Sequence, residues 1–124
     1  MPQSLGITSE ATIKNYKEVF TSPSISSNTL TLDLSLGNVF NVSLNANITT
    51  MTISNVPSTT HNVNLTIVFT ADGTTRSVTW PNSVVWPSGT APGITSTNGK
   101  IDVYTFTTNN GGTTWYGFIG GQNY

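Results

Sequence analysis

The chain has 124 residues, enough for one domain with a modest core, and only 7% of them are charged where an ordinary globular chain has about 25%. Its polarity comes instead from 23 Thr, 14 Ser and 14 Asn. The chain has four scattered cationic side chains and a net charge of −1. So few cations cannot neutralise a series of phosphates, which argues against a protein that binds nucleic acid or an anionic membrane. Abundant Thr and Asn argue against a helical bundle.

The chain contains no cysteine, so no disulfide contributes to its stability. The first eight residues, MPQSLGIT, contain neither a basic segment nor an apolar one, and we expect no secretory signal there. No stretch approaches the 18 or so apolar residues of a membrane span, so we expect no membrane insertion.

Residues 1–28 differ from the rest, because they hold two acidic and two basic side chains and show little alternation. Ser9 could cap a short helix, but Thr12, Ile13 and Val19 favour an extended arm. We expect this arm to attach the protein to a neighbour. The apolar residues expected to make the assembly contacts are Ile7, Ile13, Tyr16, Val19 and Phe20.

Strict alternation of apolar and polar residues begins after Asn28. Residues 30–36 predict a half-buried strand with Asp33 facing water, and residues 40–48 predict a second strand after a turn at Gly37.

In residues 40–48 the apolar side chains occupy even-numbered positions, whereas the next two, Met51 and Ile53, occupy odd-numbered ones. A bulge or turn near Thr49 and Thr50 must therefore change which side of the strand faces the core. Residues 63–69 predict another strand, and Asp72 followed by Gly73 predicts a hairpin that returns over residues 76–80.

Pro81 and Pro87 bracket a short run that predicts an edge strand or a corner. The Asn-Gly pair at 98–99 predicts a hairpin between residues 94–97 and 100–107, and the turn at 109–112 leads into a last strand over 113–119. About eight strands mostly joined by hairpins predict an all-β fold, an antiparallel β-sandwich or jelly roll over residues 29–124.

Residues that could carry catalysis are few. His61 is the only histidine and lies in a polar loop without a nucleophile signature. No two carboxylates are placed as a glycosidase requires. Asp102 shares a strand face with Tyr104, and we expect it to be partly covered and paired with Arg76 or Lys100. Metal and phosphate motifs are absent, so the sequence predicts no enzyme, no metal and no cofactor.

The aromatic residues have two interpretations. Exposed rings flanked by Asn and Thr can stack on sugars and hydrogen-bond their hydroxyls. In a chain with so few large side chains, the same rings are more often needed in the core. The residues of this glycan-platform hypothesis are Trp80, Trp86, Tyr104, Trp115 and Tyr116.

Several segments together resemble a β domain of structural proteins from tailed bacteriophages, especially phages of marine bacteria and cyanobacteria. They are LTLDLSLGNVF (30–40), ITTMTISNVP (48–57), VTWP (78–81), VWPSG (85–89), DVYTF (102–106) and GGTTWYGFIGGQN (111–123). The resemblance covers about residues 29–124 and implies a location in the virion, with assembly in the host cytoplasm and release by lysis. It implies no enzyme activity and transfers no binding residues.

Two functions follow from this resemblance. One is a small capsid decoration (cement) protein or head fibre, expected to be a homotrimer, whose arm docks on other virion proteins such as the major capsid or tail proteins. The other is a tail-fibre or receptor-binding tip that holds host surface glycans. A glycan depolymerase ranks below both, because the carboxylates do not pair.

Overall fold

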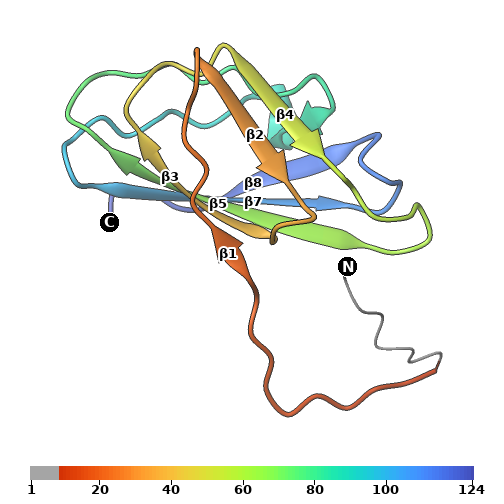
Figure 1. Ribbon diagram of the computed structural model, residues 1–124. Helices are drawn as coiled ribbons and strands as arrows, with labels where there is room; N and C mark the ends of the chain where they lie inside the picture. The colour runs from red at the N-terminus through yellow and green to blue at the C-terminus, as the bar shows by residue number, and fades with distance from the viewer. Residues whose placement is uncertain (1–8) are drawn as a thin grey trace.

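The alternating segments of the sequence form strands that pack in two layers (Figure 1). A computed structural model describes residues 9–124, which contain eight strands, one 3-10 turn at Pro87–Gly89 and no α-helix. The strands are β1 (Phe20–Thr21), β2 (Thr29–Asp33), β3 (Val39–Leu44), β4 (Thr50–Ser54), β5 (Val63–Ala71), β6 (Val84–Val85), β7 (Ile101–Thr108) and β8 (Trp115–Gly121). The expected all-β sandwich is therefore confirmed.

The strand pairing differs from the antiparallel arrangement expected. The larger sheet has the order β1-β3-β5-β7-β8-β6, and the smaller sheet pairs β2 with β4. From β2 to β5 the chain alternates between the two layers, so strands two apart in sequence become neighbours and run parallel. The pairs β1/β3 and β6/β8 are also parallel, and only β5/β7 and β7/β8 are antiparallel.

This alternation between layers explains the change of parity near Thr49. Phe40, Val42 and Leu44 point from β3 into the space between the sheets, and Met51 points into the same space from β4 on the other side. The face resets because the chain has crossed to the opposite layer. The predicted change of face is confirmed, and its cause is a change of sheet rather than a bulge within one strand.

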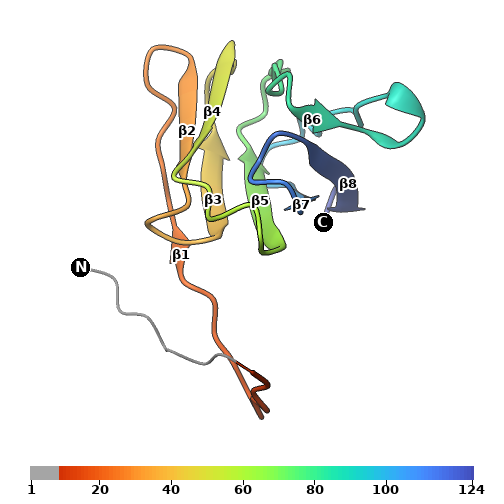
Figure 2. The ribbon, with the colours of Figure 1, turned by 90° about the vertical axis from the view of Figure 1, so that its right-hand side faces the viewer.

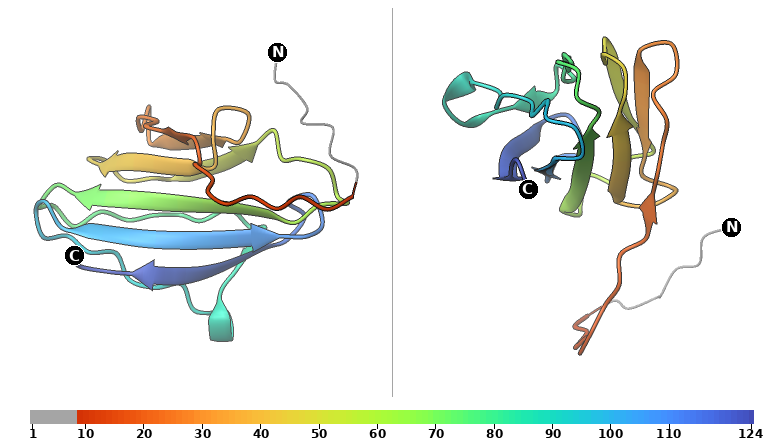
Figure 3. Two further views of the ribbon diagram at one scale, coloured as in Figure 1. Left: turned by 90° about the horizontal axis from the view of Figure 1, so that it is seen from below. Right: turned by 90° about the vertical axis from the view of Figure 1, so that its left-hand side faces the viewer.

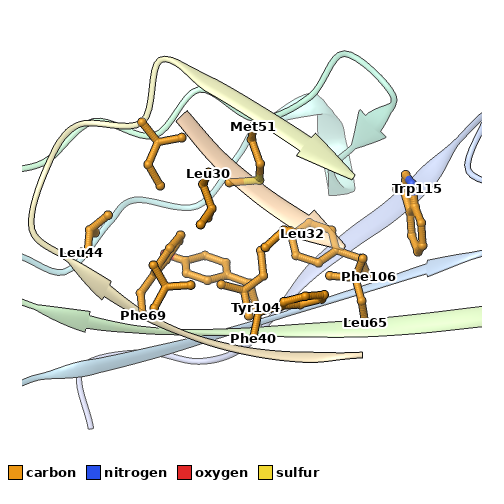
Figure 4. Packing of buried hydrophobic residues seen from close by; sticks show 13 residues of the cluster. Leu30, Leu32, Phe40, Leu44, Met51, Leu65, Phe69, Tyr104, Phe106 and Trp115 are labelled. Atoms are coloured by element: carbon orange, nitrogen blue, oxygen red, sulfur yellow. The ribbon is translucent and has the colours of Figure 1, made fainter. Parts of the chain in front are cut away.

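The core lies between the two layers (Figure 4). Leu30, Leu32 and Met51 from the smaller sheet meet large side chains of the six-stranded sheet. The fully buried members of the cluster are Leu30, Leu32, Phe40, Val42, Leu44, Ile48, Leu65, Ile67, Phe69, Tyr104, Phe106 and Trp115.

A two-stranded sheet cannot cover a six-stranded one, and irregular chain completes the second layer. Val78, Trp80, Trp86 and Ile94 pack against the core cluster from the segment between β5 and β7. Figure 2 shows this segment and β6 beside β8, away from β2 and β4. Large side chains therefore take the place of missing strands over that half of the sheet.

Two expected hairpins do not form. Asp72 and Gly73 make a turn, but both neighbours of β5 are already occupied by β3 and β7, and residues 76–80 leave the sheet. There Val78 forms a single parallel bridge with Ile48. Residues 98–99 also turn the chain, yet β7 then pairs with β5 rather than with residues 94–97.

Two other turn predictions are confirmed. Residues 109–112 connect β7 and β8 as an antiparallel hairpin, and β6 between Pro81 and Pro87 is an edge strand of the larger sheet. Asn110 organises the hairpin turn, since its side-chain oxygen accepts hydrogen bonds from the Thr108 hydroxyl at 3.0 Å and from the Thr114 N–H at 2.9 Å.

Candidate functional site

The N-terminal arm is an extended chain that leaves the sandwich at the β1 edge of the six-stranded sheet, as Figures 1 and 3 show. Phe20 and Thr21 pair with the start of β3. The side-chain amide of Asn38 donates a hydrogen bond to Glu18 at 2.5 Å, and the Asn38 N–H donates to the carbonyl of Val19 at 3.1 Å. These contacts hold the arm against the sandwich from Glu18 onward.

The apolar side chains of the arm point into solvent. Ile13, Tyr16, Val19 and Phe20 are each between 61% and 72% exposed. Ile7, the fifth residue expected to make assembly contacts, lies outside the described residues. Exposed large apolar side chains on an extended segment are typical of a surface that a partner covers.

The proposed glycan platform is mostly core. Trp80 and Trp86 cross with ring centroids 5.1 Å apart, and Trp80 lies 5.2 Å from Tyr104 and 5.5 Å from Phe106. Tyr104 is completely buried beneath these two tryptophans. The prediction that Tyr104 offers a ring face to a ligand is therefore wrong, because these rings complete the second layer of the sandwich.

Trp115 and Tyr116 are neighbours in sequence and lie on opposite faces of β8. Trp115 is 1% exposed and packs in the core, so the prediction that it belongs to a glycan platform is also wrong. Tyr116, by contrast, is 50% exposed. The structure does not bring the five residues together as one surface. It leaves Tyr116, with half-buried Trp86 and exposed Phe118, along a shallow apolar groove at the β6 and β8 edge.

Asp102 is 2% exposed and has no cationic partner among its hydrogen-bond donors. Its carboxylate accepts hydrogen bonds from the N–H of Thr95 at 2.8 Å, the N–H of Asn123 at 3.0 Å and the hydroxyl of Tyr104 at 3.1 Å. The side-chain amide of Gln122 donates a further bond at 3.3 Å. The expected ion pair is wrong, because backbone and side-chain donors have replaced the cation.

These contacts shift both pKa values. Burial opposes the ionisation of Asp102, but the hydrogen bonds that its carboxylate accepts outweigh burial and hold its pKa below the usual value. Burial, and then the charge of Asp102, raise the pKa of Tyr104. The pair is thus held as carboxylate and neutral phenol, the state in which Tyr104 donates. The arrangement ties the C-terminal residues to the loop before β7.

The other polar residues considered for chemistry are dispersed. Arg76 pairs with Asp72 at 2.5 Å within one loop, and His61 is exposed, with its Nδ1 atom 3.0 Å from the hydroxyl of Thr60. Within residues 9–124 no three His, Cys, Asp or Glu side chains gather to hold a metal ion. No helix within residues 9–124 is long and apolar enough to cross a membrane.

Sequence reasoning missed the outer face of the six-stranded sheet, the face turned away from β2 and β4. Strand register places Val39, Thr66, Thr105 and Phe118 in one row across four strands. The next row contains Asn41, Val68 and Val103. The sequence did contain an indication of this face: Val68 in β5 and Val103 in β7 occupy positions that alternate with the buried ones, where polar residues were expected.

Comparison with protein-family models, with curated proteins and with solved structures finds no match for this chain.

Proposed function

We propose that this protein is a structural component of a bacteriophage virion, a small capsid decoration or head-fibre protein that docks by its arm and displays the sandwich. The resemblance of residues 29–124 to phage structural domains supports the location. The exposed apolar side chains of the arm are the observation that supports docking, because the sandwich does not cover them. The partner is another virion protein, and the protein itself is a homo-oligomer, expected to be a trimer.

An extended arm suits a decoration protein physically. It adds contact area without requiring the displayed domain to change, and its ordering on the partner costs conformational entropy that buried apolar side chains offset. The charged side chains of the arm, among them Lys14 and Lys17, add polar contacts around that apolar centre.

The test is binding of the full-length chain to purified shells and, separately, to purified tails of the phage that encodes it. We expect binding to shells. In the double variant Ile13→Asp and Tyr16→Asp, binding falls by more than about tenfold, because two carboxylates enter an apolar contact.

The double variant Thr12→Asp and Asn15→Asp is the matched control. It adds the same charge at exposed neighbouring positions and is expected to bind like the wild type. Equal loss in both variants would mean that charge alone, and not the apolar contact, is responsible. Full binding by the Ile13 and Tyr16 variant would refute docking through the arm.

One observation favours the second function, a receptor-binding tip of a tail fibre. Strand register places Asn64, Thr107 and exposed Tyr116 side by side in one row of the outer face. An aromatic ring beside amide and hydroxyl groups is an arrangement that suits a sugar. Binding to tails rather than shells, together with loss of host-cell adsorption in Tyr116→Ala, would support this function over decoration.

A further inference from the structure

The outer face of the six-stranded sheet carries no charged side chain. On β3, β5, β7 and β8 the outward positions hold Val, Ile, Thr, Asn, Ser, Tyr, Phe and Gly. The charged residues of the chain lie in the arm, in the loops, at the end of β2 and, for Asp102, inside the sandwich. Charges on a solvent-facing sheet oppose association, so a face without them permits close contact with another chain.

The centre of this face is apolar. Val68 and Val103 are directly opposite one another on β5 and β7, and both are half-buried. Val39 and Phe118 lie in the adjacent row, and Phe118 is 48% exposed. The patch therefore runs across the sheet rather than along one strand, as expected of a surface that meets another sheet.

We propose that the outer face is the surface through which copies of this chain pack against one another. This inference rests on the homo-oligomer of the proposed function and not on the arm. Because like faces meet about a two-fold axis, its unit is a pair of copies rather than the expected trimer. It names the partner as a second copy and the contact as sheet against sheet, centred on Val68 and Val103.

The lack of charge favours an identical copy over a different protein. When like faces meet, any charged side chain is brought toward its own equivalent and is desolvated, whereas an unlike partner can supply the opposite charge for specificity. The hydroxyl of Thr66 fits the same conclusion, because a hydroxyl both donates and accepts and so complements its own copy.

The whole face is just large enough for such a contact. Four strands spaced about 4.8 Å apart, rising about 3.3 Å per residue, give a face of roughly 20 by 25 Å. Two such faces in contact bury on the order of 1,000 Å² in total, the lower bound for a specific interface. Phe20 on β1 and Val85 on β6 extend the face at its margins.

The test is the mass of the full-length chain in solution, measured by light scattering or sedimentation. We expect twice the mass of the 13.2 kDa chain for the wild type. We expect the mass of one chain for Val68→Lys, with an unchanged β-sheet circular dichroism spectrum. Thr52→Lys is the matched control, because Thr52 and Thr31 are exposed and paired on the outward side of the smaller sheet.

A wild type that remains a single chain at its highest soluble concentration would overturn the inference, and so would a folded Val68→Lys that keeps the wild-type mass. If Val68→Lys does not fold, Phe118→Lys decides in its place, since Phe118 is half exposed at the sheet surface. Failure of the arm proposal would look different. The Ile13 and Tyr16 variant would then bind shells normally, whatever its oligomeric mass.

Discussion

The carboxylate of Asp102 accepts a hydrogen bond of 3.1 Å from the hydroxyl of Tyr104, two residues along the same strand and on the same buried face. Both side chains point inward because β7 alternates, and both lie against the loop at residues 93–95. The carboxylate accepts a hydrogen bond from the N–H of Thr95, and the Tyr104 hydroxyl, which shares its one proton between the two acceptors, also lies 3.0 Å from the carbonyl oxygen of Gly93. In the part of the chain that the structure describes, the buried carboxylate of Asp102 is stabilised by neutral hydrogen-bond donors and by no cation. Because the other buried polar residue, Thr108, also lies on β7, this strand is the most polar part of the core.

Removing the Tyr104 hydroxyl should destabilise the protein measurably. We expect Tyr104→Phe to lower the free energy of unfolding by about 1 to 3 kcal/mol, since the lost donor serves a buried charge. Urea denaturation measures the change. Tyr116→Phe, which removes an exposed hydroxyl from β8, is the control and should be neutral. Equal effects in the two variants would contradict the assigned role of Asp102.

Stability should fall in acid through Asp102. Its folded-state pKa lies below that of the unfolded chain, so its contribution is complete above the unfolded value of about 3.9 and is lost as pH falls through the folded value. The free energy of unfolding is expected to be nearly constant from neutral pH to about pH 5 and to decline below about pH 4. Asp102→Asn should start less stable and show a flatter acid limb in urea titrations at a series of pH values.

The alkaline limb should depend on Tyr104. Its folded-state pKa is raised, so stability is complete below the unfolded tyrosine value of about 10 and is lost as pH rises above it, when only the unfolded chain ionises. Thermal melts above about pH 10 should show a steeper fall for the wild type than for Tyr104→Phe. Parallel curves for the two proteins would assign the alkaline loss to other groups.

Trp115 and Tyr116 separate core packing from ligand binding. Trp115→Ala should cost about 3 to 5 kcal/mol of stability, because it empties a fully buried site in the core. Tyr116→Ala should cost less than about 1 kcal/mol. Chemical denaturation compares them, and a folded, stable Trp115→Ala would contradict the packing described for β8.

Gly117 is a close-approach position in β8. A Cβ atom there would lie 2.9 Å from Cζ3 of Trp86 and 3.0 Å from Cε2 of Phe106, so Gly117→Ala should cost about 1 to 3 kcal/mol. At Gly93 an added Cβ meets nothing within 4 Å, and Gly93→Ala should be close to neutral. Melting temperatures of the two variants check the difference.

The strands themselves were predictable, because period-2 alternation identifies a half-buried strand whatever its partner. The partners were not, since the same alternation serves parallel and antiparallel neighbours alike. Asp72 with Gly73 illustrates the difficulty: its turn chemistry is real, but β5 was already paired on both sides. Residues 76–80 therefore lie outside the sheet, where the side chain of Val78 packs against the core cluster.

The candidate sites were predictable to a similar extent. The arm was predicted from its different composition, and its apolar side chains from Ile13 to Phe20 are exposed in the structure. The donors to Asp102 could not be inferred, because they come from residues 95, 104, 122 and 123, which only the tertiary fold brings together. Val68 and Val103 were overlooked because a single apolar residue on a polar parity is common in any one strand, and only register places the two side by side.

The alternation of β2 to β5 between layers has a consequence for how the chain reaches this structure. Within residues 9–124 the β7–β8 hairpin is the only antiparallel pair of consecutive strands, so most pairings must close long loops before they gain any contacts. β5, which lies between β3 and β7, has both neighbours only after β7 has been synthesised. We therefore expect the sandwich to form slowly, once β7 and β8 are both available, with the β7–β8 hairpin as its first ordered part.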